Sequence, residues 1–401
     1  MPNNTATNIG VVFLSRHTPL EKSFLTGYTG LSMQRQVTIL ALETSCDETG
    51  VALVRAVQSG GNYCFDVQED LLHSQVRLHR RTGGVVPEVA AREHAVRLPR
   101  LLQVLITRRT HAALRRQVDA IAVTNGPGLI TSLLVGVEAA RLIAYAWRKP
   151  LVPVNHLEGH VYANLLKADS RSQKSKVKSQ KFNSKSKIYR SPAFQFPLLA
   201  LIVSGGHTEL ILMRHHLNYQ LVGATRDDAA GECFDKCARL LGLPYPGGPE
   251  LARLALRGRP DAVPLPRPML KDQTLEMSFA GLKTAVAVYL EQHPRISRPD
   301  LAASIEAAIV DTLVAKTLRA VTRLEPRTVV LAGGVAANLH LRKTLEAELK
   351  QRFSDIIFIQ PALKYATDNA AMIAAAGAIR FLNGRATKWD KVRVDPQLPL
   401  K

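Results

Sequence analysis

The sequence predicts an α/β fold of two related lobes, because one strand–turn–strand pattern occurs twice along the chain. In each copy, an apolar run typical of a buried strand leads through a polar turn into a second strand. The first copy comprises residues 37–42, 43–50 and 51–54, and the second comprises residues 198–203, 204–208 and 209–213. A third turn, containing the glycine pair Gly333 and Gly334, follows the strand predicted at 329–332.

Turns of this kind can hold phosphate oxygens with backbone N–H groups. We therefore expect a nucleotide between the lobes, which is the arrangement of actin-like and sugar-kinase-like ATPases, with the active site in the interlobe cleft. For the turn at 43–50 an ordinary hydrophilic turn is an equally good interpretation, since its density of Thr, Ser and Asp is unusual but not diagnostic.

Five parts are predicted along the chain. They are a disordered N-terminal extension (1–36), a first lobe (37–166), a basic disordered insertion (167–196), a second lobe (197–360) and a C-terminal segment that returns to the first lobe (361–401). The extension has no sustained apolar periodicity and contains one acid, Glu21. A transit peptide would look similar, but Met33 stands just before the first strong strand. We expect the functional chain to start near Met33.

Composition restricts the class of partner. The formal net charge of +20 over 401 residues is typical of a protein that binds a polyanion.

The four cysteines show no disulfide spacing, which favours a reducing cytosol. We expect Cys233 and Cys237 to be buried packing groups. No run of 18 apolar residues is present, so no membrane span is predicted.

The strongest chemical signal is the segment PVNHLEGH at 153–160. If it begins a helix, His156 and His160 at i and i+4 leave one face about a turn apart, which is metal-ligand spacing. Two partly exposed polar histidines are the competing interpretation. A zincin-like protease is excluded, because Leu157 follows the first histidine and Glu158 lies on the opposite face of the helix.

A third ligand is expected from the C-terminal part of the chain. In the segment KYATDNAAM, Thr367 is a plausible N-cap and Asp368 would lie in the first helical turn. An acid at such a position is usually only part of the cap. Asp368 is nonetheless the best candidate for completing a metal site.

Nine motifs follow one another along the chain: ALETSCDETGVAL, GGVVPEVAAREH, VTNGPGLITSLLVGVEAAR, HLEGH, IVSGGHTEL, DDAAGECFDKCARLLGLPYPGG, SFAGLKTAV, LAGGVAANLHLR and TDNAAMIAAAG. Together and in this order they resemble the TsaD family of tRNA N6-adenosine threonylcarbamoyltransferases, once misnamed O-sialoglycoprotein endopeptidases. The motifs resemble those of bacterial members more than those of archaeal members. The resemblance covers residues 37–377 apart from the basic insertion. It departs from the family mildly, at Ala280 where Ser is common and at Ala366 where Cys is common.

The resemblance implies a substrate, a cofactor and site residues. It places one divalent metal ion, Fe²⁺ by family association although Zn²⁺ also suits these ligands, on His156, His160 and Asp368. The implied donor is threonylcarbamoyl-AMP, and the acceptor is N6 of the adenosine just 3′ of the anticodon in tRNAs reading codons that begin with A. The implied residues for the small-molecule substrate are Ile202, Val203, Ser204, Gly205, Gly206, Asp235, Gly248 and Asn338.

The resemblance also implies work in the cytoplasm with a shorter TsaD paralogue (TsaB) and a small P-loop ATPase (TsaE), without a membrane. Two other classes compete. One is a sugar-kinase-like ATPase, whose chemistry does not require the HLEGH motif. The other is a non-catalytic scaffold of a tRNA-modification complex, which would not require both histidines and Asp368. Residues 167–190, with nine basic residues against Asp169 alone, fit either a loop that strengthens tRNA binding or a solvated linker.

Overall fold

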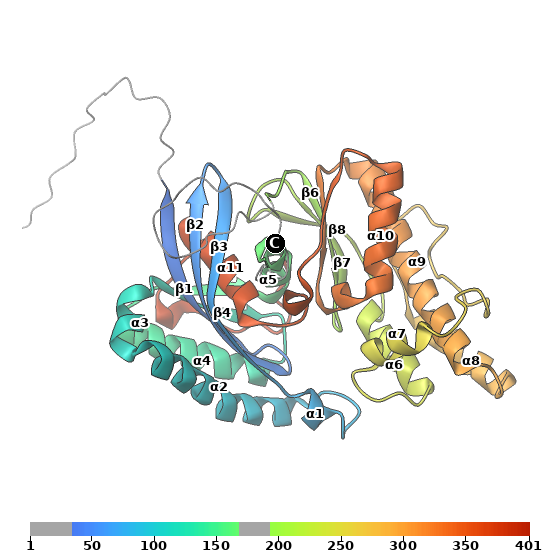
Figure 1. Ribbon diagram of the computed structural model, residues 1–401, viewed down its shortest axis with the longest axis horizontal. Helices are drawn as coiled ribbons and strands as arrows, with labels where there is room; N and C mark the ends of the chain where they lie inside the picture. Colours follow the sequence, from blue (N-terminus) through green and yellow to red (C-terminus); the bar gives the residue numbers. More distant parts are fainter. Residues whose placement is uncertain (1–33, 168–192) are drawn as a thin grey trace, which may run out of the picture. The chain divides into compact units, whose positions relative to one another are not determined.

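Two five-stranded sheets with the same strand pattern form the framework of the protein. The computed structural model describes residues 34–167 and 193–401, and Figure 1 shows the arrangement of the elements. Residues 1–33 of the predicted extension, the start at Met33 and residues 168–192 of the basic insertion lie outside the described residues. Residues 34–401 belong to one compact unit, so the lobe boundaries at 166, 197 and 360 stay predictions.

The first sheet has the strand order β3-β2-β1-β4-β5. Its strands are β1 (Arg35–Glu43), β2 (Glu48–Ser59), β3 (Asn62–Ser74), β4 (Ala120–Gly126) and β5 (Leu151–Asn155). Strands β1 to β3 are antiparallel neighbours, and β4 and β5 join β1 in parallel.

The second sheet repeats this pattern in the order β10-β9-β6-β7-β8. Its strands are β6 (Leu198–Val203), β7 (Thr208–Met213), β8 (Tyr219–Ala224), β9 (Thr328–Ala332) and β10 (Ile357–Ile359). Strands β6 to β8 form the antiparallel part, and β9 and β10 join β6 in parallel. Two mixed sheets of the same connectivity confirm the predicted α/β fold of two related halves.

Helices follow and cover the strands. The α-helices of the first half are α1 (Val76–His79), α2 (Pro87–Arg109), α3 (His111–Gln117), α4 (Ile130–Trp147) and α5 (His156–Tyr162). Those of the second half are α6 (Ala230–Leu240), α7 (Gly247–Ala255), α8 (Ala280–Gln292), α9 (Arg298–Leu324) and α10 (Leu339–Arg352). The last helix, α11 (Ala370–Leu382), packs on β1 and β2 of the first sheet. Short 3₁₀ turns are η1 (Ala163–Leu165), η2 (Gly334–Ala337), η3 (Leu363–Tyr365) and η4 (Trp389–Lys391).

The central strands are apolar throughout because both faces of each sheet are covered. In β1, Ile39 packs into one core cluster, while its neighbour Leu40 packs into the cluster shared with α2 and α4. The cluster that contains Ile39 also contains Ile202 of β6 together with residues of α5 and α11. Helices α5 and α11 therefore pack in a core to which both sheets contribute (Figure 1).

Helix α4 is the one helix, among the described residues, that is long and apolar enough to cross a membrane. It packs against α2 and β4, and Leu133, Val137 and Ala140 on that side are buried. It also carries Glu138 and Arg141, which form an ion pair with each other. These contacts are those of a core helix covering a sheet.

Candidate metal centre and adenylate site

The histidine pair lies on a short buried helix at the end of β5, as the spacing predicts. The strand stops at Asn155, whose side-chain Oδ1 accepts a hydrogen bond from Leu157 N at 2.9 Å and so caps α5. His156 is 8% exposed and His160 is 1% exposed. The interpretation as two partly exposed polar histidines is therefore wrong.

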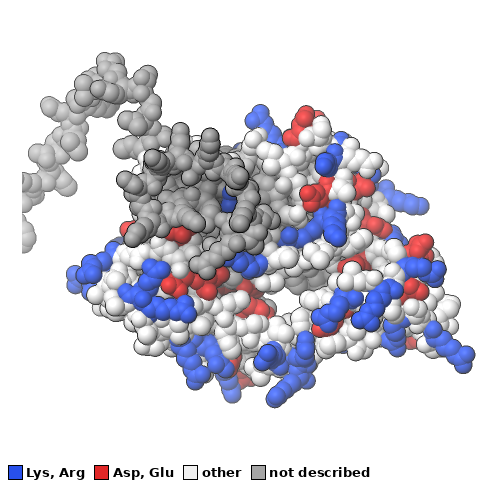
Figure 2. Space-filling model, viewed as in Figure 1, with Lys and Arg blue, Asp and Glu red and all other residues white. Residues whose placement is uncertain are grey.

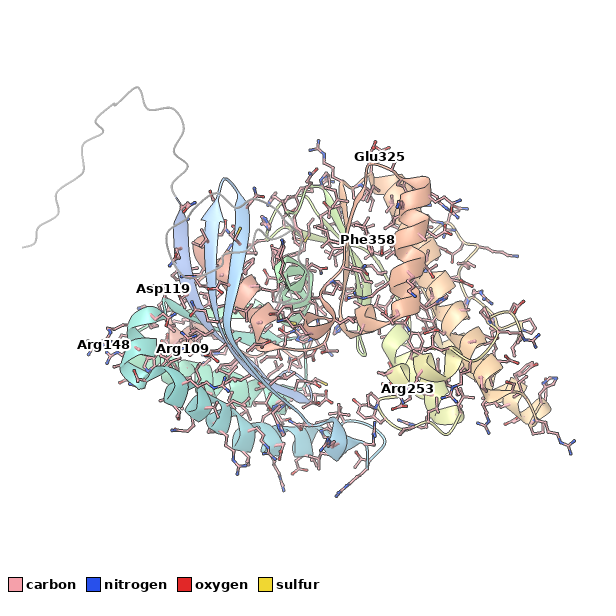
Figure 3. All side chains as sticks on the ribbon, viewed as in Figure 1. Arg109, Asp119, Arg148, Arg253, Glu325 and Phe358 are labelled. Carbon is pink, nitrogen blue, oxygen red and sulfur yellow. The ribbon has the colours of Figure 1, made fainter. Side chains whose placement is uncertain are left out.

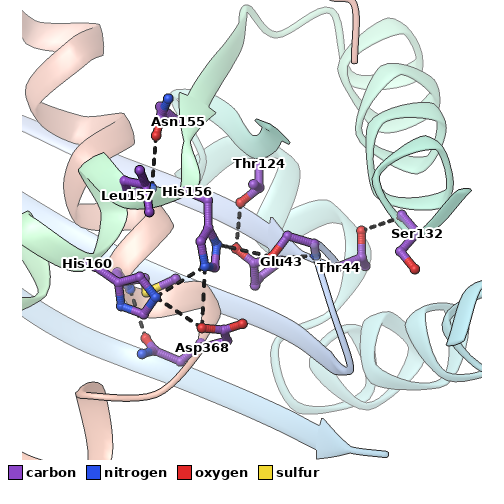
Figure 4. A network of polar contacts seen from close by, with 12 residues as sticks. Glu43, Thr44, Thr124, Ser132, Asn155, His156, Leu157, His160 and Asp368 are labelled. Atoms are coloured by element: carbon purple, nitrogen blue, oxygen red, sulfur yellow. Dashed lines mark hydrogen bonds and ion pairs between the residues drawn. The ribbon is translucent and has the colours of Figure 1, made fainter. Parts of the chain in front are cut away.

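Asp368 joins the pair from a segment 208 residues further along the chain (Figure 4). The predicted cap is wrong by two residues: Asn369, not Thr367, is the N-cap of α11, and its Oδ1 accepts from Met372 N at 2.9 Å. The Asn369 amide also donates to Thr367 O at 2.8 Å. Asp368 consequently stands outside the helix, and its carboxylate is not used in capping.

Three ligand atoms converge at this point. His160 Nε2 lies 3.2 Å from His156 Nε2 and 3.1 Å from Asp368 Oδ1, and His156 Nε2 lies 3.4 Å from the same oxygen. Ligand bonds of about 2.1 Å at angles of about 90–110° separate ligand atoms by about 3.0–3.4 Å. Within the described residues, these are the side chains that group as a possible metal site. Both the spacing and the His₂Asp donor set fit a divalent transition metal.

Glu43 supports His156 from behind. Its Oε2 lies 3.4 Å from His156 Nδ1 and accepts a hydrogen bond from the Thr124 hydroxyl at 2.6 Å, while Oε1 accepts from Ser45 N at 2.6 Å. Ser45 Oγ lies 3.0 Å from the same His156 nitrogen. These contacts at Nδ1 hold the ring so that Nε2 faces Asp368, as in carboxylate–histidine–metal arrangements.

Neighbouring charges at this site favour a protonated His156 next to ionised Asp368 and Glu43. Burial opposes protonation of His156, but the negative charges of Asp368 and Glu43 raise its pKa well above the ordinary value. Burial would raise the pKa of Asp368, but His156 and His160 lower it strongly. For Glu43, too, the effect of His156 outweighs burial and lowers the pKa. A carboxylate kept ionised beside imidazoles is what a cation site requires.

The polar turn at 43–50 folds inward. Thr44, Ser45 and Thr49 are at most 1% exposed. The Thr44 hydroxyl donates to Ser132 O, and the Thr49 hydroxyl lies 2.8 Å from His94 Nδ1. This turn is thus neither a solvated turn nor, with these hydroxyls engaged, an open phosphate cradle. The sequence interpretation missed Glu43 as the support of His156.

Glu158 lies on the side of α5 away from the ligands, as predicted, but it is fully buried. Its Oε2 accepts a hydrogen bond from Arg380 of α11 at 2.9 Å, and its Oε1 accepts one from the Tyr219 hydroxyl of β8 at 2.8 Å. Burial outweighs these partners and raises the pKa of Glu158. One carboxylate therefore connects the histidine helix, the helix after Asp368 and the second sheet, and no sequence pattern indicates this role.

The residues implied for the adenylate surround the end of β6. Gly205 and Gly206 are exposed in the turn to β7, and a Cβ built on either would meet no atom within 4 Å. Ile202 and Val203 are 0% exposed and are paired within the sheet, so in this structure neither residue presents a surface to a ligand. Ser204 Oγ accepts a hydrogen bond from His207 N at 3.0 Å, which shapes the turn.

The other implied residues lie on α6 and α7 and at the N-cap of α10. Gly231 N of α6 donates to Ser204 O at 3.2 Å, and α6 carries Asp235, whose Oδ1 accepts from Gly248 N at 2.9 Å. Asn338 caps α10 by accepting from Leu341 N, and it donates to Glu306 at 2.6 Å. Within the described part of the chain, the side-chain hydrogen bonds of Asn338 go to Glu306 and Leu341 and not to the turn or to Asp235. Its role toward a ligand stays a prediction.

Comparison with solved structures defines the fold class. The chain is similar to full-length HypF in a phosphate- and nucleotide-bound form, with a TM-score of 0.52 and 11% identity over 88% of this chain and 47% of that one. It is similar to T. kodakarensis HypF with the same TM-score and 13% identity over 90% of this chain and 50% of that one. The chain spans about half of each HypF, and at these identities the likeness shows an α/β fold of two mixed sheets, not an activity.

Comparison with sequences defines the family. The model of the TsaD family, described as tRNA N6-adenosine threonylcarbamoyltransferase, matches residues 66–174 and 180–375. Proteins of that description from Geobacillus kaustophilus (strain HTA426) and Moorella thermoacetica are 42% and 44% identical to this chain, over 92% and 91% of it and 98% of their own lengths. The chain belongs to the TsaD family of tRNA N6-adenosine threonylcarbamoyltransferases. The predicted family and enzyme class are confirmed.

Proposed function

We propose that this chain transfers the threonylcarbamoyl group from threonylcarbamoyl-AMP to N6 of the adenosine just 3′ of the anticodon, in tRNAs reading codons that begin with A. The observation that carries the proposal is the convergence of His156, His160 and Asp368 within one buried group. In the reaction, N6 forms a bond to the carbamoyl carbon, the bond from that carbon to the AMP phosphate oxygen breaks, and N6 loses a proton. AMP is a good leaving group, so positioning and charge stabilisation are the main tasks of the protein.

His156, His160 and Asp368 would hold the metal ion, Fe²⁺ in our proposal with Zn²⁺ as the alternative. When bound, the metal supplies a Lewis acid for the carbamoyl carbonyl. Glu43 and Ser45 keep the His156 ring in orientation from its Nδ1 side. Neighbouring charges keep Asp368 ionised, so it is available as an anionic ligand.

The adenylate would lie against the turn of Ser204, Gly205 and Gly206. The open space in front of both glycines supports this assignment, because phosphate and ribose need close approach to the backbone there. The ends of β6 and β9 are adjacent and parallel, and ligands of open α/β sheets bind beyond such carboxyl ends. Ile202 and Val203, at the end of β6, would support this turn from below, while Asp235, Gly248 and Asn338 would line the same site.

A TsaB-like paralogue and a TsaE-like P-loop ATPase are the proposed partners, in the cytoplasm. Helices α2 and α4 pack against each other and leave apolar side chains exposed along their N-terminal halves. Val89 and Val96 on α2 are 37% and 45% exposed, and Ile130 and Leu134 on α4 are 50% and 42% exposed. Exposed apolar groups on neighbouring helices are typical of a protein-binding surface, and we assign this one to the paralogue.

The test is mass spectrometry of nucleosides from tRNA incubated with the purified protein, the two partners, threonine, bicarbonate and ATP. We expect N6-threonylcarbamoyladenosine with the natural chain and none with His160→Ala. Product formation by His160→Ala at the natural rate would contradict the proposal. It would favour the alternative function of a non-catalytic, actin-like scaffold. The presence of all three ligand residues argues against that alternative.

A further inference from the structure

A strongly basic surface lies at the end of the first sheet where β4 and β5 begin. We call it the basic edge and define it by Arg115, Arg116, Arg148, Lys149, Lys388 and Lys391. The first four line a hollow of about 550 Å³ together with His111 and Trp147. Figure 2 shows Lys and Arg side chains over α2 and α3, and Figure 3 labels Arg148 at this end of the molecule.

The C-terminal segment brings the two lysines to the same edge. Leu151 at the start of β5 exchanges backbone hydrogen bonds with Thr387, at 3.1 and 2.8 Å. This pairing places η4 beside α4, and Tyr145 meets Trp389 with ring centroids 5.2 Å apart. Tyr145 lies one turn before Arg148 on α4, so the aromatic pair connects the lysines to the hollow.

The positive charge of the basic edge is not neutralised locally. Within the described residues none of its six cations forms an ion pair, whereas many other Arg side chains of the same structure do. Nearby acids are few: Asp119 accepts a hydrogen bond from Thr38 N, Glu138 pairs with Arg141, and Asp390 lies between the two lysines. The six cations outnumber Asp119 and Asp390, so the basic edge carries an excess of positive charge.

Cations at helix C-termini offset the helix dipole, and this explains one cation in the last turn of α3 and one directly after α4. It does not explain two at each end, nor the lysines of the C-terminal segment. Arg148 also has a left-handed backbone with φ of 56°, a conformation that glycine or asparagine adopts at lower cost. If this position only had to end the helix, glycine or asparagine would be the more favourable residue.

Exposed aromatic rings accompany the cations. Tyr145 is 64% exposed and Trp389 is 42% exposed. Cationic surfaces that bind nucleic acid commonly combine phosphate contacts with exposed rings on which bases stack. An acidic protein partner would use the charges but has no need of the rings.

The basic edge is distant from the metal ligands. Strand β5 runs from Leu151 beside this edge to Asn155, and α5 with both histidines follows directly. Five residues of strand cover about 17 Å, which corresponds to about five base pairs of a duplex at roughly 3.4 Å each. A nucleic acid that reaches the metal centre would meet the basic edge through nucleotides other than the reacting one.

We propose that the basic edge binds the sugar-phosphate backbone of the tRNA, several nucleotides away from the adenosine that is modified. This inference rests on the proposed function for the identity of the nucleic acid. Each phosphate neutralised by a cation releases counterions, so binding through this edge contributes to the salt dependence of tRNA affinity.

The experiment measures tRNA binding to the full-length chain by fluorescence anisotropy over a series of salt concentrations. The test variant carries Arg115→Gln, Arg116→Gln, Arg148→Asn and Lys149→Gln, since asparagine tolerates the left-handed backbone. A control variant carries Arg257→Gln, Arg295→Gln, Lys343→Gln and Lys350→Gln, four exposed cations of the second half. Both variants lose four positive charges, so a difference between them reports location rather than net charge.

We expect the test variant to flatten the slope of log affinity against log salt by about 3, at roughly 0.7–0.9 for each lost phosphate contact, with the control close to the natural chain. The inference would be overturned if the salt slope flattened equally in both variants, or if it changed in neither. Unchanged tRNA affinity with lost binding of a partner protein would also overturn it, by assigning the edge to that protein. If the natural chain itself binds no tRNA, the proposed function fails instead. Melting temperatures of all three chains show whether a loss reflects unfolding.

Discussion

The buried contact between Glu158 and Arg380 yields a prediction whose magnitude follows from the structure. Arg380→Met would remove the cation and leave a carboxylate that is 0% exposed, with the Tyr219 hydroxyl as its remaining side-chain donor. Removing one partner of a buried ion pair costs about 3–5 kcal/mol. Because Arg380 is itself 26% exposed and burial already raises the pKa of Glu158, so that its protonation is easier, we expect the lower end, about 3 kcal/mol.

The assay is thermal unfolding. At about 2.1 cal/mol/K per residue, the entropy of unfolding of a unit this long is roughly 0.8 kcal/mol/K, so a loss of about 3 kcal/mol lowers Tm by about 4 °C. The matched control is Arg253→Met, which breaks the pair with Glu250 on the surface of α7, where Arg253 is 63% exposed (Figure 3). Surface pairs contribute about 0–1 kcal/mol, so this change should move Tm by about 1 °C or less.

A double variant separates the ion pair from the packing of the arginine side chain. Glu158→Gln combined with Arg380→Met removes the unpaired charge, so it should unfold at a higher temperature than Arg380→Met alone. The reasoning would be refuted if Arg380→Met and Arg253→Met gave the same Tm. It would also be refuted if Glu158→Gln lowered Tm as much in the Arg380→Met background as it does in the natural chain.

Three further predictions concern the site. His160→Ala should remove most bound metal while leaving the fold intact, and elemental analysis showing unchanged metal content would exclude the His₂Asp assignment. Gly206→Val should abolish adenylate binding in calorimetry without lowering Tm, because its side chain enters open space; natural affinity in this variant would place the nucleotide elsewhere. Glu43→Gln should weaken metal binding about 10–100-fold by loosening the His156 ring. Competition with a chromophoric chelator measures this, and an unchanged affinity would show that Ser45 alone orients the ring.

Local patterns were sufficient to predict much of the fold. The continuous apolar runs in β1 and β6 predicted strands buried on both faces, and the two strand–turn–strand units predicted the repeated sheet. The spacing of His156 and His160 predicted one helix face because helical geometry alone decides it. Cys233 and Cys237 are buried as expected, with sulfurs 4.0 Å apart and no disulfide.

Contacts between distant segments could not be predicted in this way. Thr367 and Asn369 are both good caps in sequence, and only the hydrogen bonds of Asn369 in the folded chain decide between them. His94 is flanked by charged and polar residues in the sequence, and no spacing rule predicts its burial on α2 against Thr49 and the carbonyl oxygen of Cys46. The pairing of Glu43 with His156 joins residues 113 positions apart, and no spacing rule reaches that far.

The distance along the chain between the ligands also determines when the metal centre can form. During synthesis from the N-terminus, both histidines are made long before Asp368, which must wait for the whole second sheet. Helix α11, which packs on β1 and β2, comes later still. A chain stopped before residue 368 therefore carries two histidines without their carboxylate, beside a first sheet whose inner face is uncovered. Stable metal loading then becomes a mark of a completed chain, since only the finished polypeptide supplies all three ligands.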